Sequence, residues 1–139
     1  MKNKYLYYIL SWTWGLPMTL VGAIVASVLV LFGYKPKKYG YSYHIEVGKN
    51  WGGLNLGMFF LTEENTSEHT KMHEVGHGLQ NCIFGVFMPI IVTIPSVIRY
   101  HYRNIREKTN NPCTTNYDDI WFEHQASEWG TKFMNNTTK

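Results

Sequence analysis

The chain has 139 residues and a mass of 16.2 kDa, which is enough for one domain and too little for two independent hydrophobic cores. Thirteen basic and ten acidic residues leave a net charge of only +3, too small to predict a nucleic-acid partner. The mean hydropathy of −0.24 is typical of a soluble protein, but it averages over a chain whose charges are strongly segregated.

The N-terminal region carries no charged residue between Lys4 and Lys35. A helix of about 20 apolar residues is enough to cross a bilayer, and several aromatic residues near the start of the run are typical of a lipid–water interface. We therefore expect residues 1–34 to form a membrane anchor, either one transmembrane helix or a helical hairpin bent at residues 15–17. A cleaved signal peptide is the alternative, but the run is too long and lacks a small-residue cleavage site.

The next region predicts a small β-structure followed by a helix. Residues 35–38 form a basic boundary where a helix would stop. A turn-forming cluster at 48–53 separates two runs rich in aromatic and aliphatic residues, which predicts an antiparallel β-hairpin with strands 41–47 and 54–61. Helix-capping residues at 65–68 predict a helix from about 67 through the low eighties.

The C-terminal half begins with the apolar segment 83–98, which contains Pro89 and Pro95 and is followed by a basic flank. Prolines kink or end helices, so this segment is not expected to be one straight helix. After a polar loop at 110–116, two acidic residues suit the first turn of a final helix, which we predict over 117–133.

The clearest chemical signal is the sequence His-Glu-Val-Gly-His at residues 73–77. On a helix, positions i and i+4 share a face, so His73 and His77 can bind one zinc ion. Glu74 lies beside them and can act as a general base toward a zinc-activated water. Solvated helix histidines beside Glu74 are the alternative.

A candidate third ligand lies in the final helix, where Glu123 begins the pattern E-x-x-A-S. This pattern resembles the second motif of the gluzincins, a family of zinc metalloproteases, and the resemblance implies that Glu123 is the third zinc ligand. Ser127 stands where that family has an aspartate that hydrogen-bonds a ligating histidine, so Ser127 is the candidate for that contact. The alternative is a solvated Glu123 with His124, Glu128 or Asp119 as the ligand.

Most of the chain also resembles a group of small bacterial integral membrane proteins. This resemblance adds support for a membrane metalloprotease and implies no substrate. It rests on four segments: Trp12–Thr19, Asn50–Leu54, His73–Asn81 and Ile120–Glu123.

The zinc ligands restrict how the chain can meet a membrane. Only one apolar segment, 83–98, lies between His77 and Glu123, and one crossing there would place the ligands on opposite sides. We therefore expect 83–98 to be re-entrant, turning near Pro89 and returning by Arg99. The positive-inside rule then favours a cytoplasmic active site at the bacterial inner membrane, because seven basic residues would flank that side: Lys35, Lys37, Lys38, Arg99, Arg103, Arg106 and Lys108.

The predicted fold class is an α+β membrane protein: a membrane anchor at 1–34 and a minimal zincin-like domain at 35–139. The expected function is zinc-dependent hydrolysis of peptide bonds in membrane-associated polypeptides, with His73, His77 and Glu123 as ligands and Glu74 as the catalytic base. Tyr117 and His124 are the candidates for stabilising the oxyanion. The strand at 54–61 is expected to bind the substrate through its free edge.

A non-catalytic membrane adaptor, in which zinc only joins two helices, is the second hypothesis. A structural zinc site usually has four protein ligands, often including cysteine, and has no need of a base. Expected partners are a polypeptide substrate and the lipid bilayer, with a homo-oligomer or larger membrane complex left open. His44, His69 and His101 are interpreted as surface residues, and Gln80 and Asn81 as hydrogen-bonding partners of neighbouring segments.

Overall fold

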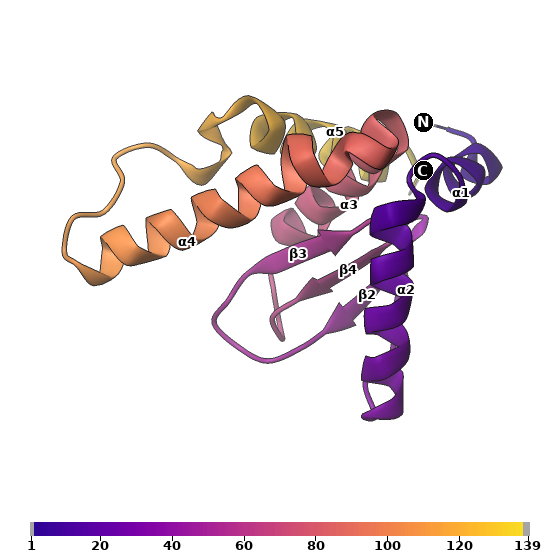
Figure 1. Ribbon diagram of the computed structural model, residues 1–139, viewed down its shortest axis with the longest axis horizontal. Coiled ribbons are helices and arrows are strands. Elements are labelled where there is room, and N and C mark those ends of the chain that lie inside the picture. Colours follow the sequence, from indigo (N-terminus) through magenta and orange to yellow (C-terminus); the bar gives the residue numbers. More distant parts are fainter. Residues whose placement is uncertain (1, 138–139) are drawn as a thin grey trace.

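Five α-helices and a four-stranded sheet make up residues 2–137, the part of the chain that the computed structural model describes (Figure 1). The helices are α1 (Lys4–Trp12), α2 (Leu16–Leu31), α3 (Glu68–Phe84), α4 (Ile94–Lys108) and α5 (Trp121–Thr137). The strands are β1 (Lys37–Tyr39), β2 (Ser42–Glu46), β3 (Gly53–Leu56) and β4 (Phe59–Thr62). A 3-10 turn at Gly85–Phe87 and a π-helical turn at Pro89–Thr93 join α3 to α4, and a second 3-10 turn at Tyr117–Asp119 precedes α5.

The sheet is mixed, and this corrects the predicted antiparallel hairpin. The strand order is β1-β2-β4-β3, with β2 parallel to β4 and the other two pairs antiparallel. The predicted strand at 54–61 divides at Gly57, whose φ of 71° makes a tight turn. The Asn55 side chain accepts the Gly57 N–H at 2.9 Å and stabilises that turn. Because β3 thus folds back on β4, β2 pairs with β4 from the other side.

The expectation of a transmembrane helix at the N-terminus is wrong. The uncharged run is broken at residues 13–15, and α1 and α2 meet at a bend of 90°. Among the described residues, no single helix is both long and apolar enough to cross a bilayer; α1 with α2, and α3 with α4, meet the criterion only as bent pairs. Pro17 lies in the first turn of α2, and the Gly15 carbonyl accepts a hydrogen bond from the Asn81 side chain at 3.2 Å. The break is therefore a packed feature of the fold.

The segment expected to be re-entrant contains a sharp turn, but it continues differently from the prediction. The chain turns between Phe87 and Pro89, and the two flanking helical stretches are bent by 117°. The helix that follows, α4, begins at Ile94 within the predicted segment and continues past Arg99 to Lys108. Pro95 is compatible with α4 because it lies in the first turn, where a missing N–H costs no helical hydrogen bond.

Two groups of buried side chains hold these elements together. The first joins α1, the sheet, α3 and α5, and contains Tyr7, Met58, Phe60, Val75, Leu79, Cys82, Phe133 and Met134. The second joins α2, β3, the turn before α4 and α5, and contains Met18, Leu56, Met88, Val92 and Phe122. Each side chain of this kind contributes about 1.5–3 kcal/mol when fully buried. The N-terminal helices thus supply core residues to the same body that carries α3 and α5.

Two glycines let α3 and α5 lie in direct backbone contact. A Cβ atom at Gly76 of α3 would lie 1.8 Å from the Ala126 carbonyl oxygen, and one at Gly130 of α5 would lie 1.7 Å from that of Met72. No side chain larger than hydrogen fits at either position unless the helices separate. This close approach brings the first turns of α5 next to the middle of α3.

Candidate metal centre

The helix α3 presents His73, Glu74 and His77 on its buried side. It begins close to the predicted position, with Ser67 as its cap and the Thr70 N–H donating to the Ser67 hydroxyl at 3.2 Å. Each of the three functional side chains is less than 8 % exposed. The predicted helix and its shared face are therefore confirmed.

Glu123, in the first turn of α5, meets both histidines. Its Oε2 atom lies 2.9 Å from His73 Nε2 and 3.1 Å from His77 Nε2, and the two Nε2 atoms are 3.1 Å apart. Ligand atoms around a tetrahedral zinc are separated by about 3.3 Å when each bond is about 2 Å long. The three residues, all buried, could hold a metal ion.

The charge state of these groups reflects their mutual contacts. Burial alone would raise the pKa of Glu123, but hydrogen bonds from His73 and His77 outweigh it and hold that pKa below its usual range. Burial alone would likewise lower the pKa of His77, but Glu123 and the neighbouring Glu74 raise it above the usual value. The Glu123 carboxylate is therefore ionised and lies beside His77 in an environment that favours positive charge, as a metal cation would require.

Both histidines are oriented by hydrogen bonds at their other ring nitrogen. His77 Nδ1 lies 2.8 Å from Gln80 Oε1, and the Gln80 amide nitrogen donates to the Phe122 carbonyl at 2.8 Å and to Gln125 at 2.9 Å. Since Gln80 uses its amide hydrogens in these two bonds, its oxygen accepts the His77 Nδ1–H. The His73 Nδ1 atom lies 2.7 Å from the Ser127 hydroxyl, which places Ser127 at the contact predicted for it. Both Nε2 atoms are then the ring nitrogens that could bind a metal ion.

Glu74 lies against β3, at the wall of the site. A Cβ atom at Gly53 would be only 2.6 Å from Glu74 Oε1, so the strand can approach the carboxylate closely because this residue is glycine. Among the described residues, the buried Glu74 Oε2 has no hydrogen-bond partner. Burial raises the pKa of the Glu74 carboxyl, although the positive character of the two histidines opposes this. The result is a buried carboxylate with one free acceptor atom.

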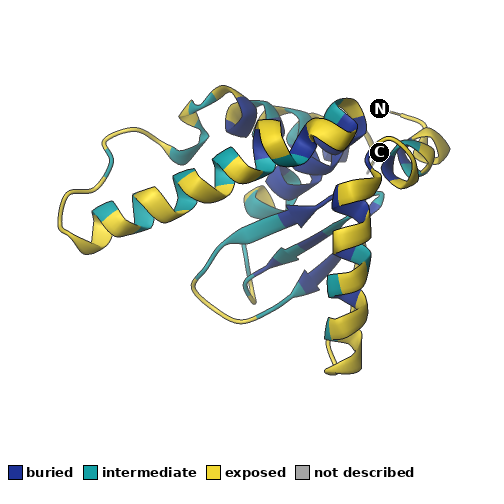
Figure 2. Ribbon diagram, viewed as in Figure 1, coloured by how far each residue is buried: buried dark blue, intermediate teal, exposed yellow. Residues whose placement is uncertain are grey.

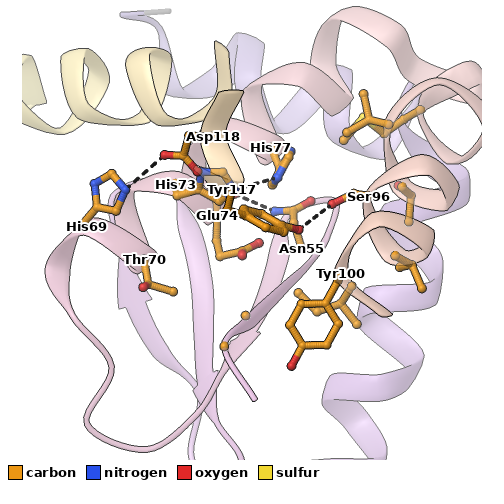
Figure 3. Close-up of a pocket in the computed structure, with 17 residues that line it drawn as sticks. Asn55, His69, Thr70, His73, Glu74, His77, Ser96, Tyr100, Tyr117 and Asp118 are labelled. Carbon is orange, nitrogen blue, oxygen red and sulfur yellow. Dashed lines mark hydrogen bonds and ion pairs between the residues drawn. The ribbon is translucent and has the colours of Figure 1, made fainter. Parts of the chain in front are cut away.

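A cavity of about 270 Å³ adjoins His73, His77 and Glu74, between β3, α3, α4 and the turn at 117–119 (Figure 3), whereas Glu123 is fully buried behind it. Its polar lining includes Ser96, whose hydroxyl donates to Glu123 Oε1 at 2.5 Å and lies 3.3 Å from the Tyr117 hydroxyl. Burial raises the pKa of Tyr117, which keeps this phenol protonated. Of the two candidates for oxyanion stabilisation, Tyr117 lines the cavity, whereas His124 is exposed and lies outside the lining.

Sequence reasoning missed several residues of this environment. Ser96, Tyr100 and Asp118 line the cavity, and so does His69, which is exposed as expected. His44, also interpreted as a surface residue, is buried against Phe60 and lies 2.6 Å from the Thr62 hydroxyl, whereas His101 is exposed as expected. Only Gln80 carried a usable signal, because a residue three positions after a helical histidine can reach it.

Asn81 behaves as predicted for a residue that joins neighbouring segments, since its side chain donates to the Gly15 carbonyl and lies 3.4 Å from Thr19.

The alternative third ligands do not join the histidines: among the described residues, the group that can hold a metal consists of His73, His77 and Glu123. The assignment of this site depends on its geometry, because comparisons with protein-family models, curated proteins and solved structures find no match to this chain.

Proposed function

We propose that this protein is a zinc-dependent metalloprotease that cleaves peptide bonds in membrane-associated polypeptides. One observation carries the proposal: Glu74, whose buried Oε2 has no partner among the described residues, lines a cavity together with His73 and His77, the two imidazoles of a buried group that could hold a metal ion. Two nitrogen ligands and one oxygen ligand suit zinc better than magnesium or calcium, which prefer oxygen alone. Three protein ligands leave a position open, as catalytic zinc sites require.

In the proposed hydrolysis, the metal and Glu74 have separate roles. Zinc, when bound, lowers the pKa of a water to about 7 and polarises the scissile carbonyl. Glu74 accepts the proton of the attacking water at Oε2 and later delivers it to the leaving amine. Burial raises the pKa of the Glu74 carboxyl toward neutral pH. A group whose pKa lies near the working pH can serve first as a base and then as an acid.

Tyr117 is the proposed oxyanion stabiliser. Its hydroxyl lies at the cavity beside Ser96, and the raised pKa keeps its proton available for donation. Two guanidinium groups of α4 lie near the ring, with Arg99 at 5.6 Å and Arg103 at 5.8 Å from its centre. These contacts hold the phenol at the mouth of the site.

The substrate is proposed to bind in extended form beside β3. This strand is an edge of the sheet, and its residues Gly53, Leu54 and Asn55 line the cavity. An edge strand can add a peptide through main-chain hydrogen bonds. The opposite wall is apolar, with Met88, Val92 and Val97 at the cavity, which favours an apolar substrate side chain next to the scissile bond.

Membrane association is proposed to occur through exposed apolar helix faces. Leu20, Ile24 and Val28 form one such face on α2, each at least 46 % exposed, and Figure 2 shows how much of α2 and α4 is open to solvent. Apolar area of this kind binds the acyl boundary of a bilayer. The α4 arginines would meet anionic headgroups, which is consistent with the cytoplasmic face of a bacterial inner membrane.

The decisive experiment compares wild type with Glu74→Gln. Both proteins are purified, their zinc content is measured, and they are mixed with a quenched fluorescent peptide that is anchored in vesicles by an apolar tail. Glu74→Gln should retain zinc and lose turnover by about 10²–10⁴-fold, the usual contribution of general acid–base catalysis. Glu64→Gln, an exposed change of the same kind, is the control. Equal turnover by Glu74→Gln and wild type would refute the assigned base.

A non-catalytic role has one observation in its favour, since Glu123 joins α5 to both histidines of α3 and a metal there would also fix the two helices together. The same experiment separates the two functions. A structural zinc predicts that metal raises the melting temperature while wild type and Glu74→Gln both fail to cleave any peptide. The unpartnered Glu74 Oε2 is the reason that catalysis is preferred.

A further inference from the structure

The hydrogen bond at His73 continues past Ser127 to a carboxylate. The Ser127 hydroxyl donates to Asp118 Oδ2 at 2.6 Å, and His73 Nδ1 lies 2.7 Å from the same hydroxyl. A serine has one hydroxyl hydrogen, and here it points to Asp118. Ser127 must therefore accept the hydrogen of His73 Nδ1, so the donors run in one direction from His73 through Ser127 to Asp118.

Two successive hydrogen bonds here connect a histidine to a carboxylate, whereas metal sites commonly use one. A ligating histidine usually donates its second ring N–H to a carboxylate or carbonyl, which fixes the tautomer and makes the metal-facing nitrogen more basic. A serine hydroxyl alone carries no charge. Asp118 accepts the hydrogen of the Ser127 hydroxyl and polarises it. The negative charge that would otherwise contact His73 directly is therefore on Asp118, the next residue in the series of hydrogen bonds.

Asp118 is held in place by its own turn. The 3-10 turn at Tyr117–Asp119 has a capping box, with the Asn116 N–H donating to Asp119 Oδ2 at 2.9 Å. The Arg99 guanidinium of α4 donates to the Asn116 carbonyl at 3.1 Å and to the Tyr117 carbonyl at 2.8 Å. The backbone that carries Asp118 is therefore fixed both by the capping contacts of the turn and by α4.

The competing interpretation assigns Asp118 to a surface pair with His69. Their closest atoms, Asp118 Oδ2 and His69 Nε2, are 3.4 Å apart, and the His69 side chain is 63 % exposed. An exposed pair of this kind contributes little. The shorter contact with Ser127 is directed inward, toward the metal ligands, and is the stronger of the two by geometry.

We propose that Asp118 is a positioning residue for the metal centre, acting on His73 through Ser127. The inference rests on the proposed zinc function, and it explains how a serine can occupy a position where the gluzincin resemblance implies an aspartate. It predicts that Ser127 and Asp118 form one functional unit. Removing either member should then weaken zinc binding to the same extent as removing both.

The test measures zinc dissociation constants by competition with a chromophoric chelator, on the full chain, for four variants. Ser127→Ala and Asp118→Asn should each weaken zinc binding by about 10–100-fold, and Ser127→Ala with Asp118→Asn should weaken it no further. The fourth variant, Asp118→Asn with Ser127→Asp, places a carboxylate directly at His73. The Asp118→Asn change in the same variant prevents two negative charges from lying side by side. This variant should recover most of the lost affinity.

Glu128→Gln is the matched control, because it removes one negative charge next to Ser127 from a residue that pairs only with exposed Lys132 among the contacts described. It should leave zinc affinity unchanged. Circular dichroism of the metal-free proteins shows whether each variant is folded. A rescued double variant cannot be explained by general loss of structure.

Two outcomes would overturn the inference. Wild-type affinity in Asp118→Asn would show that the Asp118 carboxylate has no effect on the metal centre, and failure of the Ser127→Asp rescue would show that the loss in Asp118→Asn is not the loss of negative charge near His73. A wild-type protein that binds no zinc is a different result, since it refutes the proposed function itself.

Discussion

The inner face of α3 and the outer face of α2 distribute polar and apolar residues in opposite ways. On α3, the interior contains His73, Glu74, His77 and Gln80, each less than 8 % exposed. On α2, the exterior carries Leu20, Ile24 and Val28, each at least 46 % exposed (Figure 2). Ordinary folding would place these two kinds of residue the other way round.

The difference shows which kind of specificity each face requires. A buried polar group is tolerated only when its partners are correctly placed, and the α3 histidines each have a defined partner at both ring nitrogens. An exposed apolar face needs no such partners, only area, and it tolerates exchange of one aliphatic residue for another. Changes on the α3 side should therefore have larger effects than changes on the α2 side.

The largest effect is expected at the carboxylate that joins the two helices. Glu123→Ala removes the atom shared by both histidines and should weaken zinc binding by more than the 10–100-fold typical of residues that only orient a ligand. Metal analysis after dialysis, with isothermal titration of zinc, measures this loss. Asn135→Ala, at an exposed position of α5, is the control. Full zinc retention in Glu123→Ala would break the comparison, because the polar interior would then be structural only.

The next effect concerns the backbone contact that brings the ligands together. Gly130→Ala places a methyl group 1.7 Å from the Met72 carbonyl oxygen, so α3 and α5 must separate. We expect the free energy of unfolding to fall by about 3 kcal/mol, at the upper end for overpacking. Zinc affinity should fall with it. Urea denaturation of this variant beside Asn135→Ala measures the change, and a loss below about 0.5 kcal/mol would show that the helices are not tightly packed.

A smaller effect is expected from pH. The pKa of His77 is raised above its usual value by Glu123 and Glu74, although burial opposes this, so a proton competes with the metal for Nε2. Zinc affinity should be constant above that pKa and fall by about tenfold per pH unit below it. Chelator competition between pH 5 and 8 tests the sign. Affinity that increases as the pH falls would contradict the assignment of a histidine nitrogen as ligand.

The smallest effect on folding is expected on the outer face of α2. Replacing Leu20, Ile24 and Val28 together with serine should change the free energy of unfolding by less than about 0.5 kcal/mol per site, because these residues are exposed. The same variant should bind anionic phospholipid vesicles more weakly in a co-sedimentation assay. Serine at Asn135 and Asn136 of α5 is the control. Unchanged vesicle binding would refute the proposed contact of α2 with the bilayer.

The sequence predicted the local parts of the molecule well. The cap at Ser67, the i and i+4 spacing of the histidines and the candidate Glu123 all follow from patterns within one helical segment. Prediction failed where distant contacts decide. The position of β4 between β2 and β3 could not be predicted from strand patterns, because the turn at Gly57 divides the apolar run 54–61 into two strands and the parallel pairing of β2 with β4 joins segments that are distant in the sequence.

The uncharged N-terminal run is a second region whose structure depends on distant contacts. Its length and lack of charge predicted either one span or a hairpin bent at residues 15–17, and the structure has a bend of 90° between α1 and α2, where Gly15 packs against Asn81 of α3. A contact between residues 66 positions apart outweighs the local helical tendency. No window of the sequence contains both members of that contact.

By itself, the sequence determined which side chains could bind a metal, because the residue types and their helical spacing can be read within one short segment. Only the tertiary structure decided that the ligands converge. Two glycines on facing helices permit backbone contact, and that contact alone sets Glu123 within 3.1 Å of both imidazoles. The carboxylate behind Ser127 was likewise decided by folding, since the 3-10 turn carries Asp118 back to a residue one helical segment away. Short-range spacing fixes which groups can act, and long-range packing fixes which of them meet.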